Sequence, residues 1–271
     1  MRRVMSRNRL IVGILLLLCV SSLTVSLDAT KLLIKFPTRE RTKKFFKCLD
    51  QHYKLLSKKH SYHFLISCDA NDVKMNNDKV KARFKKYDNL TVIYGERVGK
   101  IGACNRDMAL ASDFDIVLLA SDDMWPHTQD YDDIIIQHME KEFPDFDGVL
   151  NFADGHPKGS HVLNTYPILG KKYFDRFNFI YHPAYLSYFC DLELALVSRL
   201  YGKEAIVDIE LLTHNNPAFT NEKDALYNFN QKLYHKDEQV FMEHLTNKFE
   251  LDFLTLEQVD YLEFCKSKMD E

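Results

Sequence analysis

Two adjacent carboxylates, Asp122 and Asp123, are the residues whose type and position most clearly suit chemistry. They follow an unbroken apolar run from Ile116 to Ala120, and such a run is typical of a strand buried on both faces of a parallel sheet. Neighbouring acids repel each other and are costly to desolvate unless a cation or hydrogen-bond donors stand opposite them. A hard divalent ion, Mg²⁺ or Mn²⁺, prefers oxygen ligands and would bridge the acids to a phosphate. The alternative is a solvated turn or a helix cap, where acids are also common.

The segments around this pair predict an α/β fold with a Rossmann-like, mostly parallel central sheet flanked by helices. Short apolar segments typical of strands alternate with segments that carry apolar residues at helical spacing. The predicted strands cover residues 31–36, 62–67, 90–94, 116–120 and 206–212. This alternation is the βαβ signature of a parallel sheet with right-handed crossovers. Because no repeat or linker divides the chain, residues 31–271 are predicted to form a single domain.

Two local predictions concern the start of helices beside the sheet. Thr38 is the expected N-cap of the first helix, because apolar residues follow it at helical spacing. The glycine-punctuated segment from Gly95 to Arg106 is expected to enter a helix that continues to about Ser112. Both predictions place polar loops at the carboxyl edge of the sheet, where ligands bind in open α/β folds.

The loops at that edge carry a set of polar side chains that favours a functional site over a solvated turn. Its members are Thr38, Arg39, Asp69, Lys100, Asn105, Asp122 and Asp123. Arg39 and Lys100 would oppose phosphate charge, although each alone also fits a solvated surface charge. Asp69 would accept a hydrogen bond from a base N–H, Asp122 would bond a ribose hydroxyl, and Asp123 would hold the ion. The set predicts a clamp for a nucleoside diphosphate.

Four pieces of the sequence resemble, in order and spacing, the GT-A-fold glycosyltransferases, most closely those of the family 2 type. They are residues 36–41 (Phe-Pro-Thr-Arg-Glu-Arg), Asp69, residues 99–105 and the triplet 121–123 (Ser-Asp-Asp). The likeness runs from about residue 31 to about residue 219. It implies the nucleotide-diphospho-sugar transferase fold, with the nucleotide held by Pro37, Thr38, Arg39 and Asp69. It also implies that Asp123 binds Mn²⁺ or Mg²⁺, although the family's motif is often Asp-x-Asp and the first position here is Ser121.

The same resemblance implies a catalytic base and a second metal ligand. A later acid at the head of a helix deprotonates the acceptor hydroxyl in the family, and Asp191 stands in that place, with Glu193 as the alternative. Asp191 is equally suited to be a helix N-cap, since an apolar helix follows it. A helix N-terminus lowers the basicity of a carboxylate, so Asp191 would act as a base only if burial raised its pKa. His214 is the expected late metal ligand, although a lone loop histidine is often structural.

These residues together predict transfer of a sugar from a nucleotide-diphosphate donor to a hydroxyl of a carbohydrate, lipid or protein acceptor. A single displacement assisted by Asp191 would invert the anomeric centre. A sugar-phosphate nucleotidylyltransferase is one alternative, but it would want a glycine-rich loop after the first strand, and residues 37–41 contain no glycine. A non-catalytic carbohydrate- or partner-binding domain is the other, favoured by Ser121 and by Cys190, which stands where the family usually has a second acid.

A few further residues are assigned to the acceptor side. Asp154 and Trp125 are expected to border the acceptor pocket, with packing beneath the metal loop as the alternative role for Trp125. Asn215, Asn216 and residues 221–245 are expected to form a lid or acceptor-side helices.

The beginning of the chain predicts entry to the secretory pathway. Four arginines precede sixteen uncharged residues, 10–25, which is typical of a signal peptide or signal anchor within residues 1–30. An anchor would leave the globular part on the lumenal side of the endoplasmic reticulum or Golgi, and cleavage would release a secreted protein. Without those arginines the chain carries 32 basic and 39 acidic residues, which argues against nucleic acid as a partner. The six cysteines show no C-x-x-C spacing, so they do not predict a zinc site.

Overall fold

The computed structural model describes residues 29–111, 113–155, 163–215 and 223–269 of the 271-residue chain. The predicted leader segment, residues 10–25, and Asn216 lie outside these ranges. Within them, no helix is both long enough and apolar enough to cross a membrane.

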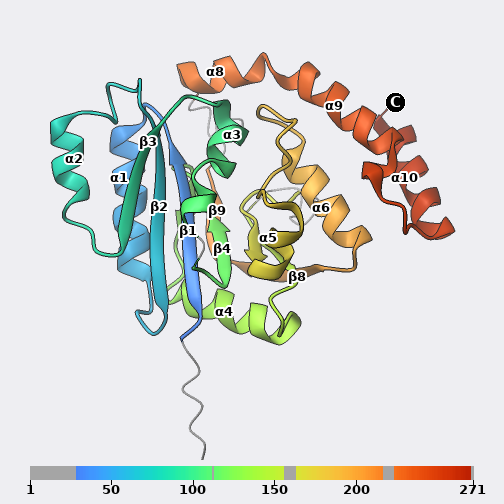
Figure 1. Ribbon diagram of the computed structural model, residues 1–271, viewed down its shortest axis with the longest axis horizontal. Helices are drawn as coiled ribbons and strands as arrows, with labels where there is room; N and C mark the ends of the chain where they lie inside the picture. Colours follow the sequence, from blue (N-terminus) through green and yellow to red (C-terminus); the bar gives the residue numbers. More distant parts are fainter. Residues whose placement is uncertain (1–28, 112, 156–162, 216–222, 270–271) are drawn as a thin grey trace, which may run out of the picture.

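A seven-stranded sheet in the order β3-β2-β1-β4-β7-β6-β8 forms the centre of the protein (Figure 1). Strands β1 to β4 run parallel to one another, β6 and β8 are parallel to each other, and β7 is antiparallel to both β4 and β6. The strands are β1 (Lys31–Thr38), β2 (Ser61–Asp69), β3 (Leu90–Gly95), β4 (Ile116–Leu119), β6 (Val149–Ala153), β7 (Ile168–Gly170) and β8 (Glu204–Glu210). The predicted α/β class and mostly parallel sheet are confirmed.

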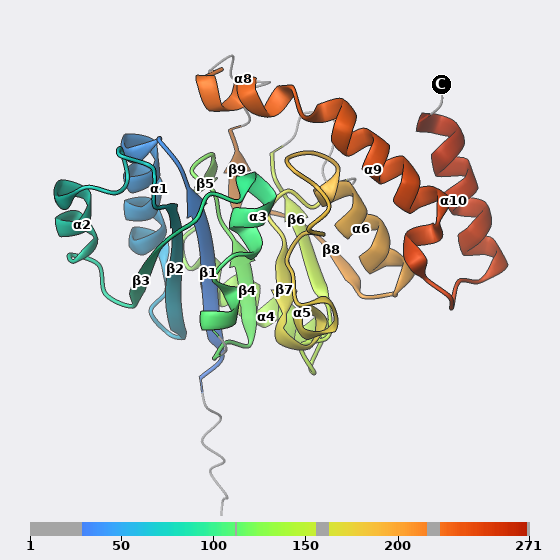
Figure 2. The same cartoon turned by 45° about the horizontal axis from the view of Figure 1, so that its top comes forward.

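Helices cover both faces of this sheet (Figures 1 and 2). Helices α1, α2 and α4 pack on one face, and α3, α5 and α6 pack on the other. Helices α8, α9 and α10, which we call the C-terminal arm, follow one another past the outer side of α6 (Figure 2). The helices are α1 (Thr42–Leu55), α2 (Asp78–Phe84), α3 (Gly99–Asn105), α4 (Tyr131–Glu142), α5 (Lys171–Phe177), α6 (Cys190–Leu200), α8 (Ala225–Gln231), α9 (Tyr234–Thr246) and α10 (Leu256–Met269), with short 3₁₀ turns η1 (Met108–Leu110) and η2 (Lys248–Glu250).

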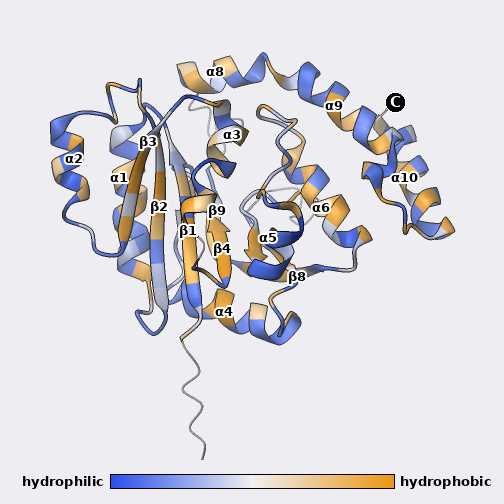
Figure 3. Cartoon of the chain, viewed as in Figure 1, coloured by the Kyte–Doolittle hydropathy of each residue, from blue (hydrophilic) through white to orange (hydrophobic). Residues whose placement is uncertain are grey.

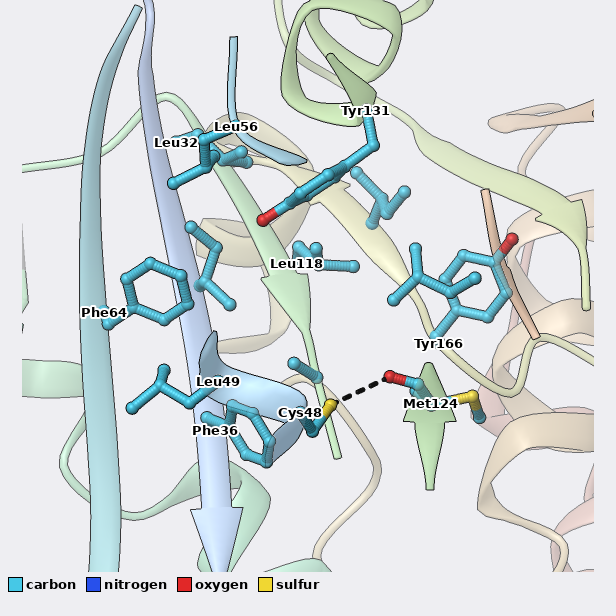
Figure 4. Packing of buried hydrophobic residues seen from close by; sticks show 14 of the residues in the cluster. Leu32, Phe36, Cys48, Leu49, Leu56, Phe64, Leu118, Met124, Tyr131 and Tyr166 are labelled. Carbon is cyan, nitrogen blue, oxygen red and sulfur yellow. Dashed lines mark hydrogen bonds between the residues drawn. The ribbon is translucent and has the colours of Figure 1, made fainter. Parts of the chain in front are cut away.

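The alternation of side chains along the strands produces these two layers. Leu32, Ile34 and Phe36 of β1 enter the core under α1, whereas Leu33 enters the core under α6, because successive residues of a strand point to opposite faces. Figure 4 shows Phe36 and Leu118 in the first of these cores. Strands β3 and β4 are accordingly mostly hydrophobic, whereas β8, at the edge of the sheet, is largely hydrophilic (Figure 3).

The core under α1 also contains a buried histidine whose pKa is set by burial. His52 is completely buried, and its Nδ1 lies 2.9 Å from the hydroxyl oxygen of Tyr131. Burial lowers the pKa of His52 to about 3, because the charged ring would have to leave water. The imidazole is therefore neutral at physiological pH.

The two local predictions for helix starts are corrected by the structure. Thr38 is not an N-cap: it is the last residue of β1 and pairs with Cys68 of β2, and α1 begins only at Thr42. Continued pairing with β2 keeps the chain extended through Pro37 and Thr38. The glycine-punctuated segment does form a helix, but α3 ends at Asn105 because Arg106 is extended and Asp107 adopts a left-handed conformation.

A second, two-stranded sheet lies beyond the carboxyl end of β4. Its strands, β5 (Met124–Pro126) and β9 (Leu212–His214), are antiparallel, and Met124 pairs with His214. The late strand predicted at residues 206–212 is thus split between β8 and β9. The pairing brings residues 212–214 next to the loop that holds Asp122 and Asp123, about 90 positions earlier in the chain.

Candidate active site

The loop after β4 is fixed from below by α1. The thiol of Cys48 donates to the carbonyl oxygen of Met124 at 3.3 Å (Figure 4) and to that of Ser121 at 3.5 Å. Within the loop, the hydroxyl of Ser121 donates to Oδ1 of Asp123. Asp122 is only 6% exposed, so the pair is not a solvated turn. Ser121, which stands where the family often has an acid, orients Asp123.

The pKa values of the two acids differ because their surroundings differ. Burial and the charge of Asp123 raise the pKa of Asp122 to about 6, against the opposing effect of the Arg41 guanidinium, whose Nη1 lies 3.0 Å from Oδ1 of Asp122. Burial would also raise the pKa of Asp123, but His214, Ser121 and other partners outweigh it, so that pKa is lowered. Asp123 therefore stays ionised to lower pH than Asp122, which suits a cation ligand.

His214 is brought to Asp123 by strand pairing rather than by sequence proximity. Its backbone N–H donates to the carbonyl oxygen of Asp154 at 2.8 Å, and the next N–H, that of Asn215, donates to the carbonyl oxygen of Asp123 at 2.8 Å. The Nδ1 of His214 lies 3.9 Å from Oδ2 of Asp154, and Asp154 is itself buried. One carboxylate and one imidazole at the end of a sheet fit Mn²⁺ or Mg²⁺, which complete their coordination with phosphate oxygens and water.

The carboxyl ends of β1 and β2 hold a second group of charged residues. Oδ2 of Asp69 accepts from Nη1 of Arg39 at 2.8 Å, and its Oδ1 accepts from Nη1 of Arg106 at 3.2 Å. Arg39, Asp69 and Thr38 thus share this edge, as the sequence predicts. Pro37 lies in β1 and pairs with Ser67, so it contributes backbone shape.

Two buried polar atoms in this group have no hydrogen-bond partner within the described part of the chain. They are Oγ1 of Thr38 and Nε of Arg39. Buried polar atoms are paired in the great majority of cases, and an orphan needs an explanation such as a ligand. Their position beside Asp69 indicates a place for a polar ligand at the end of β1.

Sequence reasoning gave no role to two arginines that organise the site. Arg41 bonds Asp122 and also binds Asp224 through two nitrogen atoms, at 2.6 and 3.0 Å. Arg106 bonds Asp69 and the carbonyl oxygens of Cys68 and Glu96. In the sequence, each arginine is the last basic residue of a segment that contains predicted site residues. No local pattern could reveal the partners of Arg41, because they lie 81 and 183 positions away.

Lys100 lies among the acids of both halves of the site. The residue is exposed, and its ammonium group donates to the carbonyl oxygen of Ser187 at 3.3 Å. Desolvation would lower the pKa of Lys100, but the thiol of Cys190 and the carboxylates of Asp123 and Asp191 raise it overall. The cation is thus secured at neutral pH.

The segment that Lys100 contacts is held by one residue of the C-terminal arm. Asp237 of α9 is completely buried, and its carboxylate accepts from the backbone N–H groups of Leu186, Ser187 and Tyr188 at 2.7–2.9 Å. This segment leads directly into α6. The start of α6 is therefore positioned by α9.

Asp191 occupies the second residue of α6 and is not its N-cap, which is Phe189 in a left-handed conformation. Its Oδ1 accepts from the N–H of Leu192 at 3.0 Å. Burial raises the pKa of Asp191 above its ordinary value, although Lys100, the helix N–H groups and His214 pull it down. Burial thus outweighs the helix terminus, which is the condition that a role as a base requires.

Three predicted residues have other partners in the structure. Glu193 is two residues after Asp191, about 200° around the helix, and its carboxylate contacts Tyr185 and His244 instead. The amide of Asn105 is committed to the backbone of Ile180 and Tyr181. Trp125 packs against the core under α1, with the ammonium of Lys47 4.9 Å from its ring centre. The side chains of Glu193 and Asn105 are thus engaged in other contacts, and for Trp125 the packing role is favoured.

No protein-family model and no curated protein sequence matches this chain. Among solved structures, the mannosyltransferase PcManGT from Pyrobaculum calidifontis, in complex with GDP-Man and Mn²⁺, is similar with a TM-score of 0.62 at 11% identity, over 87% of this chain and 68% of that one. Residues 1–349 of TarS from S. aureus give a TM-score of 0.55 at 14% identity, over 84% and 77% of the two chains. The same TarS fragment in complex with UDP gives 0.53 at 13% identity.

The present chain shares the fold of these structures, the GT-A fold. The fold that the sequence resemblance implies is confirmed. At 11–14% identity the likeness concerns the arrangement of the chain, so the activity has to be argued from the site.

Proposed function

We propose that the protein is a divalent-metal-dependent glycosyltransferase that moves a sugar from a nucleotide-diphosphate donor to an acceptor hydroxyl with inversion. One observation carries the proposal. Lys100 and His214 each lower the pKa of both Asp123 and Asp191, and the N–H of Asn215, next to His214, donates to the carbonyl oxygen of Asp123. A cation-binding acid and a candidate base therefore face the same space.

The donor half of the site is assigned to the carboxyl ends of β1 and β2. Thr38 and Arg39 offer unpaired buried donors beside Asp69, which suits the base and ribose of a nucleotide. Asp122, which is mostly protonated only below about pH 6, offers an acceptor to a ribose hydroxyl at neutral pH. The neighbours of this fold include structures in complex with GDP-Man and with UDP, which supports a nucleotide as the ligand.

The diphosphate and the metal are assigned to Asp123, His214 and Lys100. When bound, Mn²⁺ or Mg²⁺ supplies Lewis-acid stabilisation of the charge on the departing diphosphate. Lys100 adds a fixed positive charge beside it, and Arg41 balances Asp122. These residues orient the leaving group and offset its charge where water is partly excluded.

The acceptor half is assigned to the start of α6. Asp191 takes the proton from the acceptor hydroxyl as its oxygen attacks the anomeric carbon, and the bond from that carbon to the diphosphate oxygen breaks. A raised pKa makes Asp191 a better base than an ordinary aspartate. Attack opposite the leaving group inverts the anomeric centre. Carbohydrate, lipid and protein hydroxyls all fit this scheme.

A nucleotide-sugar panel tests the proposal without knowledge of the acceptor. Slow donor hydrolysis is measured with UDP- and GDP-linked sugars, with Mn²⁺, with Mg²⁺ and with chelator. We expect one donor to release nucleoside diphosphate only when the divalent ion is present. Formation of a nucleotide sugar and pyrophosphate from a nucleoside triphosphate and a sugar 1-phosphate, measured in a parallel assay, would instead indicate a nucleotidylyltransferase. Binding of a nucleotide sugar without any turnover would indicate a non-catalytic binding domain.

A further inference from the structure

A second group of potential ligands lies on the other side of α6 and shares no residue with the proposed transfer machinery. His182 comes from the segment between α5 and α6, Glu193 from α6, and His244 from α9. One ligand atom from each residue can be chosen so that all three lie within 4.8 Å of one another. Three elements that are far apart in the sequence thus converge on one point.

The three side chains are held in place by their neighbours. Glu193 is 6% exposed, and its Oε2 accepts from the hydroxyl of Tyr185 and from Nδ1 of His244, the latter at 2.8 Å. The rings of His182 and His244 meet edge to face with centres 4.6 Å apart. A proton on Nδ1 of His244 now joins the imidazole to the carboxylate, at the place where a cation would lie between them.

The group opens onto a cavity of about 360 Å³ whose lining includes all three residues. The rest of its wall is aromatic and aliphatic apart from one amide and one acid, Asn247 and Glu250. The carboxylate of Glu250 is thus one further oxygen donor at this cavity. A metal held by the three residues would keep a coordination position facing the cavity, as three-ligand sites do.

We propose that His182, Glu193 and His244 bind a borderline divalent transition-metal ion, with Zn²⁺ as the best fit. Two imidazoles and a carboxylate are a donor set that zinc uses, whereas Mg²⁺ prefers oxygen ligands. Tetrahedral bonds of about 2.0–2.1 Å place ligand atoms about 3.4 Å apart, which side-chain rotation reaches from separations of up to 4.8 Å. The ion would join α9 of the C-terminal arm to α6.

Zinc binding by the metal-stripped protein tests this site directly. The background is the double variant Asp123→Ala, His214→Ala, which removes the candidate ligands of the other site. We expect one equivalent of Zn²⁺ to bind to this variant in competition with a chromogenic chelator, and to raise its melting temperature. Co²⁺ bound in place of Zn²⁺ should give the intense visible absorption of tetrahedral coordination.

Single substitutions in that background locate the ion. His182→Ala and His244→Gln should each weaken Zn²⁺ binding by at least about tenfold, and Glu193→Gln should do the same while it retains a hydrogen-bonding group. His235→Ala is the matched control, because His235 is an exposed histidine on the same helix, and it should leave binding unchanged. Circular dichroism without metal identifies any variant that fails to fold. The Zn²⁺ affinities of the folded variants then test which residues bind the ion.

Three outcomes would overturn the proposal. They are failure of the background variant to bind Zn²⁺, unchanged affinity in the folded His182 and His244 variants, and loss of affinity in His235→Ala equal to theirs. None of them bears on sugar transfer, because the readout is metal binding.

Discussion

The two faces of α6 show how the same residue types serve different ends. Asp191 faces Lys100 and the Asp123–His214 pair, whereas Glu193 faces Tyr185, His182 and His244. On the first face acids are crowded, burial raises the pKa of Asp122 to about 6, and arginine or lysine side chains offset the charge. On the second face the carboxylate of Glu193 accepts from a hydroxyl and an imidazole. Crowded acids call for a hard cation, and imidazoles beside one acid suit a borderline metal.

Replacing Asp123 should have the largest effect and should separate the two faces. Asp123→Ala removes the acid that stays ionised to lower pH, so we expect kcat for transfer to fall at least about 1,000-fold. Zinc affinity at the second face should not change. The measurement is diphosphate release with saturating Mn²⁺, alongside a zinc titration. Retention of Mn²⁺-dependent turnover would exclude Asp123 as the metal ligand.

Replacing Asp191 should have the next largest effect, about 100-fold or more on kcat. Asp191→Asn keeps the size of the side chain but cannot accept the proton. Because a base must be unprotonated, the rate of the parent should fall as pH drops through the raised pKa of Asp191, and burial is the cause of that raised pKa. The variant should lose this acidic limb. Donor affinity, measured by calorimetry, should be unaffected; an unchanged acidic limb would assign it to another group.

His52 is a buried histidine whose pKa is lowered by burial, and it can be compared with His244, which bonds the carboxylate of Glu193. Its pKa is about 3 in the folded protein, lowered by burial, and about 6.5 when unfolded. The unfolded state therefore binds more protons between these values, so its contribution to stability is present above pH 6.5 and is lost as pH falls, by about 2 kcal/mol at pH 5. His52→Phe should flatten this part of the stability curve, as measured by urea unfolding. His235→Phe, at an exposed position, should not.

The unpaired hydroxyl of Thr38 gives the smallest expected effect and tests the donor half alone. Thr38→Val should weaken binding of the nucleoside diphosphate by about twofold to tenfold, which corresponds to one neutral hydrogen bond. Stability should not fall, because the hydroxyl has no partner to lose in the free protein. Thr42→Val is the control: that hydroxyl bonds the carbonyl oxygen of Lys74, so stability should fall and affinity should not. The reverse pattern would place the ligand elsewhere.

The sheet and its carboxyl edge were predictable because they follow from local patterns. Apolar runs locate the parallel strands, and the residues after each run must meet at one edge, which brings Thr38, Asp69 and Asp122 together. Strand pairing across the second sheet, which places His214 beside Asp123, is non-local, and here only the family resemblance pointed to it.

The remaining features depend on contacts over long sequence separations. The bond between Arg41 and Asp224 joins the first loop to the C-terminal arm, 183 residues away. His182, Glu193 and His244 come from three separate elements of the fold. Their spacing in the sequence therefore does not predict that they form a cluster. The helical phase of Glu193 relative to Asp191, by contrast, was available from the sequence, since residues two apart cannot share a helix face.

The carboxylate of Asp237 has a practical consequence for the far end of the chain. It accepts hydrogen bonds from three successive backbone N–H groups ahead of α6. The carbonyl oxygen of Ser187, in the same segment, accepts from Lys100. In a shortened protein that stopped before α9, those N–H groups would lose their carboxylate partner. The segment that accepts the hydrogen bond from Lys100 would then no longer be fixed. Removal of what looks like a peripheral tail would thus disturb the proposed active site.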